Sequence, residues 1–213
     1  TGFITDFVTY GKIGTEAGTI STDISLRPEE NNTFRIKGLI KGSNVDLGLL
    51  TDKSDILGKL SMETNVDGFA TSSKKISGNL SGKIDSIEVN SYVYRNVILN
   101  GIFTEKTWDG SIKISDSNIK MDMLGMLDFS NELPEFDFTL NLAKSNLNKL
   151  NFDKADTTSH LSMLATANFK GNNIDNIFGE IKLLNSTIQK HNSKLELYDF
   201  TLSPAQYFGF DAH

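Results

Sequence analysis

Alternation of apolar and polar residues is the strongest constraint that this sequence places on its fold. In segments 76–84, 108–114 and 136–142, every second residue is apolar or glycine, and the residues between are Asp, Lys, Asn, Ser or Thr. Successive side chains of a β-strand point to opposite faces, so each segment predicts a strand with one apolar and one polar face. Strands of a parallel sheet are buried on both faces and therefore have continuous apolar runs instead. The pattern therefore predicts an all-β protein with an antiparallel sheet.

Glycine occurs repeatedly on the apolar side of the alternating segments, where no charged residue occurs. Because glycine weakens a strand interior, this predicts strong curvature or close approach to the backbone. With only three prolines in the chain, turns must come from Gly, Asn and Asp, and 65–69 (NVDGF), 107–111 (TWDGS) and 169–173 (FKGNN) are predicted to be hairpin turns. The apolar-side glycines are Gly58, Gly68, Gly78, Gly82, Gly101, Gly110 and Gly179.

The chain also resembles itself after a shift of about 100 residues. Phe34 aligns with Phe136, and the triplet LSM at 60–62 aligns with LSM at 161–163. We therefore expect two structural copies that should superpose.

Each copy contains one short stretch without alternation, near 44–50 and 146–152, where Ser or Asn can cap a helical turn. No linker rich in Pro or Ser separates the copies. We expect two β-groove repeats, 1–102 and 103–213, each with one short helix, that share one elongated, curved antiparallel sheet.

Composition excludes several partners and chemistries. The 213 residues carry a net charge of -6 and a sequence pI near 5.1, and no basic run exceeds Lys74-Lys75. Nucleic acids select basic surfaces, so we expect no nucleic-acid partner. Without cysteine there is no disulfide scaffold and no thiolate metal site. No apolar run approaches the ~18 residues of a transmembrane helix, which predicts either a soluble chain or the loss of a targeting end.

No residue pattern indicates catalysis. His160, His191 and His213 lie in a polar register, in a polar turn and at the last position, so none is expected to be catalytic. Nucleophile elbows, phosphate loops and zinc-protease motifs are all missing from the sequence. We expect a protein that is not an enzyme and has no cofactor and no metal.

Two pairs of acids recur in equivalent loops, Asp52 with Asp55 and Asp153 with Asp156. Such pairs can contribute to a calcium shell, but the spacing lacks the EF-hand pattern. Turn capping is the more typical role for acids in such loops.

Aromatic and sulfur-containing side chains allow two interpretations. Trp108 with Tyr92 and Tyr94 is compatible with a sugar-stacking platform, but Trp108 falls in the apolar register, which favours a core anchor. Several Met and Phe residues share that register, and such soft surfaces suit either irregular core packing or changeable apolar ligands. Ordinary core packing is the commoner of the two.

Residues 82–138 (GKIDSIEVNS…LPEFDF) and 167–187 (ANFKGNNIDNIFGEIKLLNST) resemble the AsmA-like proteins of Gram-negative bacteria. Within that family the resemblance is greatest to the TamB type, the inner-membrane component of the translocation and assembly module. It covers most of residues 1–203 and implies an elongated sheet curled into an apolar groove, a β-taco, as in repeating β-groove lipid-transfer proteins. It also implies that the chain is a middle fragment of a longer periplasmic protein anchored in the inner membrane.

We therefore expect a periplasmic bridge segment with a hydrophobic groove for phospholipid transport between the inner and outer membranes, for outer-membrane protein assembly, or for both. The partners would be phospholipid acyl chains and, through parts outside these residues, an Omp85-type outer-membrane barrel. The alternative is a structural or adhesive β-array that conducts no ligand. Alternation alone selects the groove-lining candidates, which are Leu60, Met62, Leu99, Phe103, Ile112, Ile114, Met121, Met123, Phe136, Phe138, Leu140, Leu142, Leu161, Met163 and Phe169.

Overall fold

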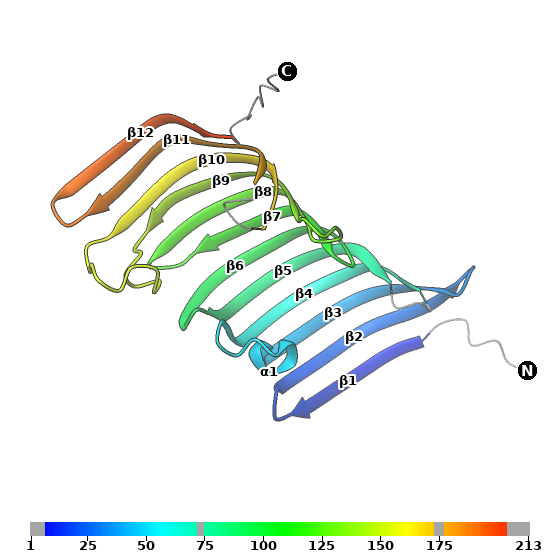
Figure 1. The fold of residues 1–213 in the computed structure, drawn as a ribbon. Helices are drawn as coiled ribbons and strands as arrows, with labels where there is room; N and C mark the ends of the chain where they lie inside the picture. The colour runs from blue at the N-terminus through cyan, green and yellow to red at the C-terminus, as the bar shows by residue number, and fades with distance from the viewer. Residues whose placement is uncertain (1–6, 72–74, 173–176, 204–213) are drawn as a thin grey trace, which may run out of the picture.

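Twelve strands form one antiparallel sheet in the computed structural model of this chain, which describes residues 7–71, 75–172 and 177–203 (Figure 1). Each strand pairs with the strands before and after it in sequence, so β1 and β12 form the two edges. The strands are β1 (Phe7–Thr15), β2 (Gly18–Glu29), β3 (Thr33–Asp46), β4 (Leu57–Thr71), β5 (Ile76–Val89), β6 (Tyr92–Thr104), β7 (Thr107–Ser115), β8 (Ile119–Asp128), β9 (Glu135–Ser145), β10 (His160–Lys170), β11 (Phe178–Lys190) and β12 (Ser193–Leu202).

The sheet confirms the all-β, antiparallel prediction. Among the described residues, extensive contacts join only consecutive strands, and the short helix α1 (Leu47–Thr51) packs on β4. No second sheet covers either face in this part of the chain. A sandwich in which the apolar faces of two copies close on each other is therefore not formed within the described chain.

The helix predicted for the second copy is not present. Residues 147–151 form hydrogen-bonded turns, in which the Leu150 amide donates to the Asn146 carbonyl at 3.1 Å. In the first copy α1 forms, but its cap is Asp46, whose carboxylate accepts a hydrogen bond from the Leu49 amide at 2.9 Å. The Asp46 carboxylate thus takes the capping role expected of Ser or Asn.

Two of the predicted hairpin turns are wrong, because residues 65–69 lie inside β4 and residues 107–111 lie inside β7. The third, 169–173, extends outside the described residues.

Asparagine contributes to two of the hairpin turns that the chain does use. Asn31 and Asn32 both adopt positive φ, 58° and 54°, between β2 and β3. Asn90 and Ser91 do the same between β5 and β6, at 52° and 59°. Positive φ at both central residues is the requirement of a type I′ turn, which matches the twist of the flanking strands.

The LSM triplets aligned in the sequence repeat lie on two different strands. Leu60 lies on β4 and Leu161 on β10, and both side chains contact the same hydrophobic cluster. The boundary between residues 102 and 103 falls inside β6, and the sheet continues through it. The division into two repeats stays a prediction.

Glycines face one another across neighbouring strands. Gly68 pairs with Gly78, and Gly101 pairs with Gly110. A Cβ atom on Gly78 would lie 2.5 Å from the Gly68 Cα, and one on Gly101 would lie 2.8 Å from the Gly110 Cα. These positions therefore exclude any larger residue unless the backbone shifts. They let the backbones approach closely within strands that are bowed along their length (Figure 1).

We expect Gly78→Val to lower the free energy of unfolding by about 3 kcal/mol, because its side chain would push against the β4 backbone. Asn79→Val is the matched control, since Asn79 is the next residue and is exposed on the polar face. It should change stability by no more than about 0.5 kcal/mol. Urea unfolding followed by circular dichroism measures both, and equal stability of the two variants would contradict the steric role of the glycine pair.

Candidate functional site

The candidate site is the apolar face, the side of the sheet on which the alternating apolar residues lie. The strand register aligns these residues into rows that cross the sheet at right angles to the strands. Residues directly opposite on antiparallel strands share a face, so each row is a continuous ladder of side chains.

Four such rows can be followed through the middle of the sheet. The methionine row contains Met62, Ile84, Val97, Ile114, Met121, Leu142 and Met163. The leucine row contains Leu99, Ile112, Met123 and Leu140. The glycine row contains Gly101, Gly110, Gly125 and Phe138. The aromatic row contains Phe103, Trp108, Leu127, Phe136 and Phe169.

The predicted lining residues all lie on this one face. Leu60 belongs to its hydrophobic cluster, Leu161 packs against that cluster, and the others stand in the four rows. Leu127 was missed because the alternation used for the prediction ended at Met123. The buried Ala165 and Ala167 of β10 also belong to this face, opposite Leu140 and Phe138.

Most of the apolar face is only half-buried. Every side chain of the leucine and aromatic rows keeps intermediate exposure, although each has apolar neighbours on both sides. Phe136 stacks on Phe169 with ring centroids 4.7 Å apart and meets Phe129 edge-on at 5.7 Å. Since a covered sheet face would be fully buried, these rows are open to a ligand or to another surface.

The opposite, polar face is held by charged pairs across the strands. Lys41 and Glu63 face each other at 2.8 Å, and Lys113 and Asp122 at 2.9 Å. All four side chains are largely exposed, so each pair contributes no more than about 1 kcal/mol.

One end of the apolar face is fully buried. A hydrophobic cluster forms there around Leu150, which is 1% exposed and lies in the loop between β9 and β10. The cluster members are Val45, Leu60, Ile84, Tyr94, Val97, Ile119, Leu142 and Leu150. Residues 146–159, here called the strap, therefore cover this end of the sheet.

The strap is tied to a turn far from it in sequence. The Asn90 side chain donates to the Asn151 carbonyl at 3.3 Å, and the Asn151 side chain donates to the Asn90 carbonyl at 2.9 Å. This reciprocal pair joins the β5–β6 turn to the loop between β9 and β10. It satisfies backbone groups at both turns and fixes the strap across the strands between them.

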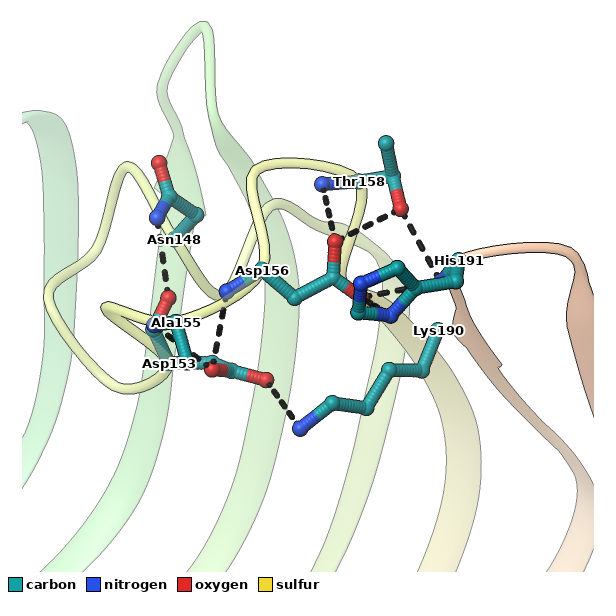
Figure 2. Close-up of polar contacts among 7 residues, drawn as sticks. All are labelled: Asn148, Asp153, Ala155, Asp156, Thr158, Lys190 and His191. Atoms are coloured by element: carbon teal, nitrogen blue, oxygen red, sulfur yellow. Dashed lines mark hydrogen bonds and ion pairs between the residues drawn. The ribbon is translucent and has the colours of Figure 1, made fainter.

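The other end of the strap is tied to the β11–β12 turn (Figure 2). Asp156, which is 2% exposed, accepts hydrogen bonds from the Thr158 amide at 2.9 Å and the Thr158 hydroxyl at 2.8 Å. It also accepts the His191 amide at 2.8 Å and lies 2.9 Å from the His191 Nδ1. Asp153 pairs with the Lys190 ammonium at 2.9 Å.

These contacts shift the acidity of both carboxyls. The Lys190 ammonium is the main cause of the lowered pKa of Asp153. Burial by itself raises the pKa of Asp156, but the hydrogen bonds from Thr158 and the His191 amide outweigh it, so this pKa is also lowered. Both carboxylates act as turn caps, and no group of three or more metal-ligating side chains occurs in the described residues.

The sugar-platform arrangement is not formed. Tyr92 and Tyr94 lie at the start of β6 and contact each other edge-on, whereas Trp108 pairs with Phe103 near the end of that strand. The Trp108 Nε1 is buried without a hydrogen-bond partner. The aromatic side chains therefore lie in two separate parts of the apolar face.

The histidines do not converge on a reactive group. His160 Nδ1 lies 3.1 Å from the Ser145 carbonyl, His191 pairs with Asp156, and His213 lies outside the described residues. A hollow of about 670 Å³ on the polar face is lined by charged and amide side chains including Glu63, Lys83 and Asp85. It contains no nucleophile paired with a base.

None of the helices in the described chain has the length and hydropathy to cross a membrane. Comparison with protein-family profiles, with characterised proteins and with solved structures finds no match to this chain. The resemblance to AsmA-like proteins therefore stays a prediction.

We expect Leu150→Ala to lower the free energy of unfolding by about 3 kcal/mol, because it opens a cavity in the one fully buried cluster. Leu50→Ala is the matched control, since Leu50 is 58% exposed on α1. Its effect should stay within about 0.5 kcal/mol. Thermal or urea unfolding compares the two, and a small effect at both positions would show that the strap does not stabilise the fold.

The lowered pKa of Asp156 predicts an acid-dependent strap. A carboxyl whose folded-state pKa is depressed stabilises the fold above its unfolded-state pKa of about 4, and this contribution is lost as pH falls through the folded-state pKa. At neutral pH the melting temperature of Asp156→Asn should therefore be lower than that of the unmodified protein. This gap in melting temperature should narrow below about pH 4. Melting temperatures across pH test this, and a gap that is constant at all pH values would contradict it.

Proposed function

We propose that this chain is a periplasmic bridge segment that carries phospholipid acyl chains on its apolar face between the inner and outer membranes. The observation that supports this proposal is the set of four rows that cross the middle of the sheet without a charged side chain. An apolar surface of this extent, half-exposed and rimmed by polar residues, is typical of a binding surface.

The chemistry of the rows suits a sliding, weakly specific cargo. Each methylene that leaves water gains about 0.8 kcal/mol, whichever part of the row it touches. The rows offer hydrocarbon, thioether and aromatic surface, and Met62, Met121, Met123 and Met163 can repack around chains of different shape. A charge in this lining would cost several kcal/mol, and none stands in the four rows.

We further propose that the sheet bends toward the apolar face and so makes it the lining of a groove. The paired glycines support this, because added Cβ atoms on the apolar side would meet the neighbouring backbone at Gly68 and Gly78 and at Gly101 and Gly110. In a groove, acyl chains would be shielded on three sides while headgroups stay in water.

The resemblance to AsmA-like proteins supports the same assignment and adds outer-membrane protein assembly as a second possible role of the segment. An Omp85-type barrel is the partner that this role would require, reached through parts of the protein outside these residues. On the polar face, the Asp67 carboxylate pairs with both Arg35 and Lys37.

A structural or adhesive β-array is the alternative function. Three side chains on the polar face favour it, because Ile98, Ile102 and Leu124 are 52%, 54% and 64% exposed among polar cross-strand neighbours. An array of this kind needs no bound lipid. Native mass spectrometry of the purified protein separates the two functions. Only transport of phospholipid along the apolar face, here called the lipid path, predicts co-purified phospholipid.

We expect Leu140→Asp to abolish lipid binding while strand content persists, because it places a carboxylate in the leucine row without removing a fully buried anchor. In the full-length protein the same change should block function. Asn141→Asp is the matched control, since Asn141 is the next residue of β9 and is exposed on the polar face. Circular dichroism and thermal melting verify folding, and native mass spectrometry counts bound lipid.

A photo-crosslinking residue at Phe138, in the glycine row beside Leu140, reports contact directly. The lipid path predicts phospholipid adducts at this position in the otherwise unmodified chain and their loss in Leu140→Asp. Normal function of Leu140→Asp together with no adduct at position 138 would overturn the lipid path and leave the structural array.

A further inference from the structure

The two margins of the apolar face, where the strands end, are built differently. At the strap margin, the strap and α1 lie against the hydrophobic cluster. At the aromatic margin, the strands end in the β6–β7 and β8–β9 turns next to the aromatic row. An acyl chain in the proposed groove would therefore meet different surroundings at its two ends.

The strap margin is sealed. Val97 and Leu142 of the methionine row are 4% and 6% exposed, and Leu150 above them is 1% exposed. The reciprocal bonds between Asn90 and Asn151 hold the strap in place there. A headgroup has no access to water at this point, because the cluster fills the space and the burial of an unpaired polar group is costly.

Among the described residues, the aromatic margin is open. Trp108 and Phe136 are half-buried, and Phe129, in the turn beyond β8, is 50% exposed. The nearby β6–β7 turn carries Glu105 and Lys106, which are both exposed to water. Amphipathic surroundings of this kind, with large aromatic rings below a charged rim, resemble the surroundings of lipid at a membrane interface.

The width between the sealed and open margins is sufficient for one acyl chain. Val97 in the methionine row and Phe103 in the aromatic row lie on β6 at positions 97 and 103. At about 3.3 Å per residue, this separation is roughly 20 Å. A bilayer has a hydrocarbon core of about 30 Å, so a single leaflet needs about 15 Å for its chains.

We propose that acyl chains lie along the strands, with their methyl ends at the strap margin and their headgroups at the aromatic margin. This inference rests on the proposed lipid path and adds a fixed orientation of the bound lipid, here called its polarity. Of the two margins, the aromatic margin is then the one at which headgroups reach water. The strap acts as a closed wall against which the chain ends stop.

Trp108 provides the test, because it is the only tryptophan of the chain and stands in the aromatic row. Phosphatidylcholine carrying a nitroxide quencher near the headgroup end of one acyl chain should quench Trp108 fluorescence severalfold more than the same lipid with the quencher near the methyl end.

With the tryptophan moved to the methionine row, the expected order of the two quenchers is reversed. In Trp108→Phe combined with Met121→Trp, the tryptophan stands in the methionine row, and the methyl-end quencher should be the stronger one. Met163→Trp in the same background serves as a further reporter on that row if the first variant does not fold, as judged by circular dichroism.

The outcomes separate the inference from the function on which it rests. Quenching that is equal for the two lipids, or strongest at Trp108 with the methyl-end label, would overturn the polarity while lipid binding stands. No quenching by either lipid at either tryptophan, together with no phospholipid in native mass spectrometry, would overturn the lipid path itself and the polarity with it.

Discussion

The structure depends on the separation of charged and apolar side chains onto opposite faces of one sheet. In the four rows, antiparallel pairing in chain order places each apolar residue opposite an apolar residue or a glycine on the next strand, so the rows are continuous. A one-residue slip of any strand would carry its charges onto the apolar face. Register and burial therefore support each other, although no second layer covers the described sheet.

A single-layer sheet leaves its apolar face only partly buried, which is unusual for a domain. Cross-strand neighbours shield the leucine and aromatic rows to intermediate exposure, whereas the cluster under the strap is fully buried. That cluster is also where a loop reaches beyond its neighbouring strands, through Asn151 to one turn and Asp156 to another. The strap thus supplies the long-range contacts that a second layer would otherwise provide.

The combination of an open apolar face and one sealed margin is what favours a lipid path over a structural array. An array needs exposed edges and a regular surface, both of which this sheet also has. It gives no reason, however, for the absence of charge in four successive rows or for the methionines among them. A binding surface for hydrocarbon explains both features, because each charge would be a barrier and each thioether adapts to a moving chain.

The sequence by itself determined the strand content, the antiparallel arrangement and the face on which each lining residue lies, because side-chain alternation follows directly from strand geometry. The glycines were informative in the same way, but Asp-Gly pairs were interpreted as turns. Gly68 and Gly110 instead stand where a neighbouring backbone leaves no room for a Cβ, a constraint that exists only after the strands are paired. Local propensity could not reveal it.

Only the tertiary structure decided that the twelve strands form one open sheet and that the strap closes one margin. The segment around Leu150 has the pattern of a short helix, yet it forms turns: the Leu150 side chain fills the cluster, and the Asn151 carbonyl accepts a hydrogen bond from the Asn90 side chain of a distant turn. The partners in these contacts, Asn90 with Asn151 and Asp156 with His191, are separated by many residues in the chain. No periodicity links such residues, so their contact, and with it the sealed margin, depends on how many strands lie between them and how the sheet bends.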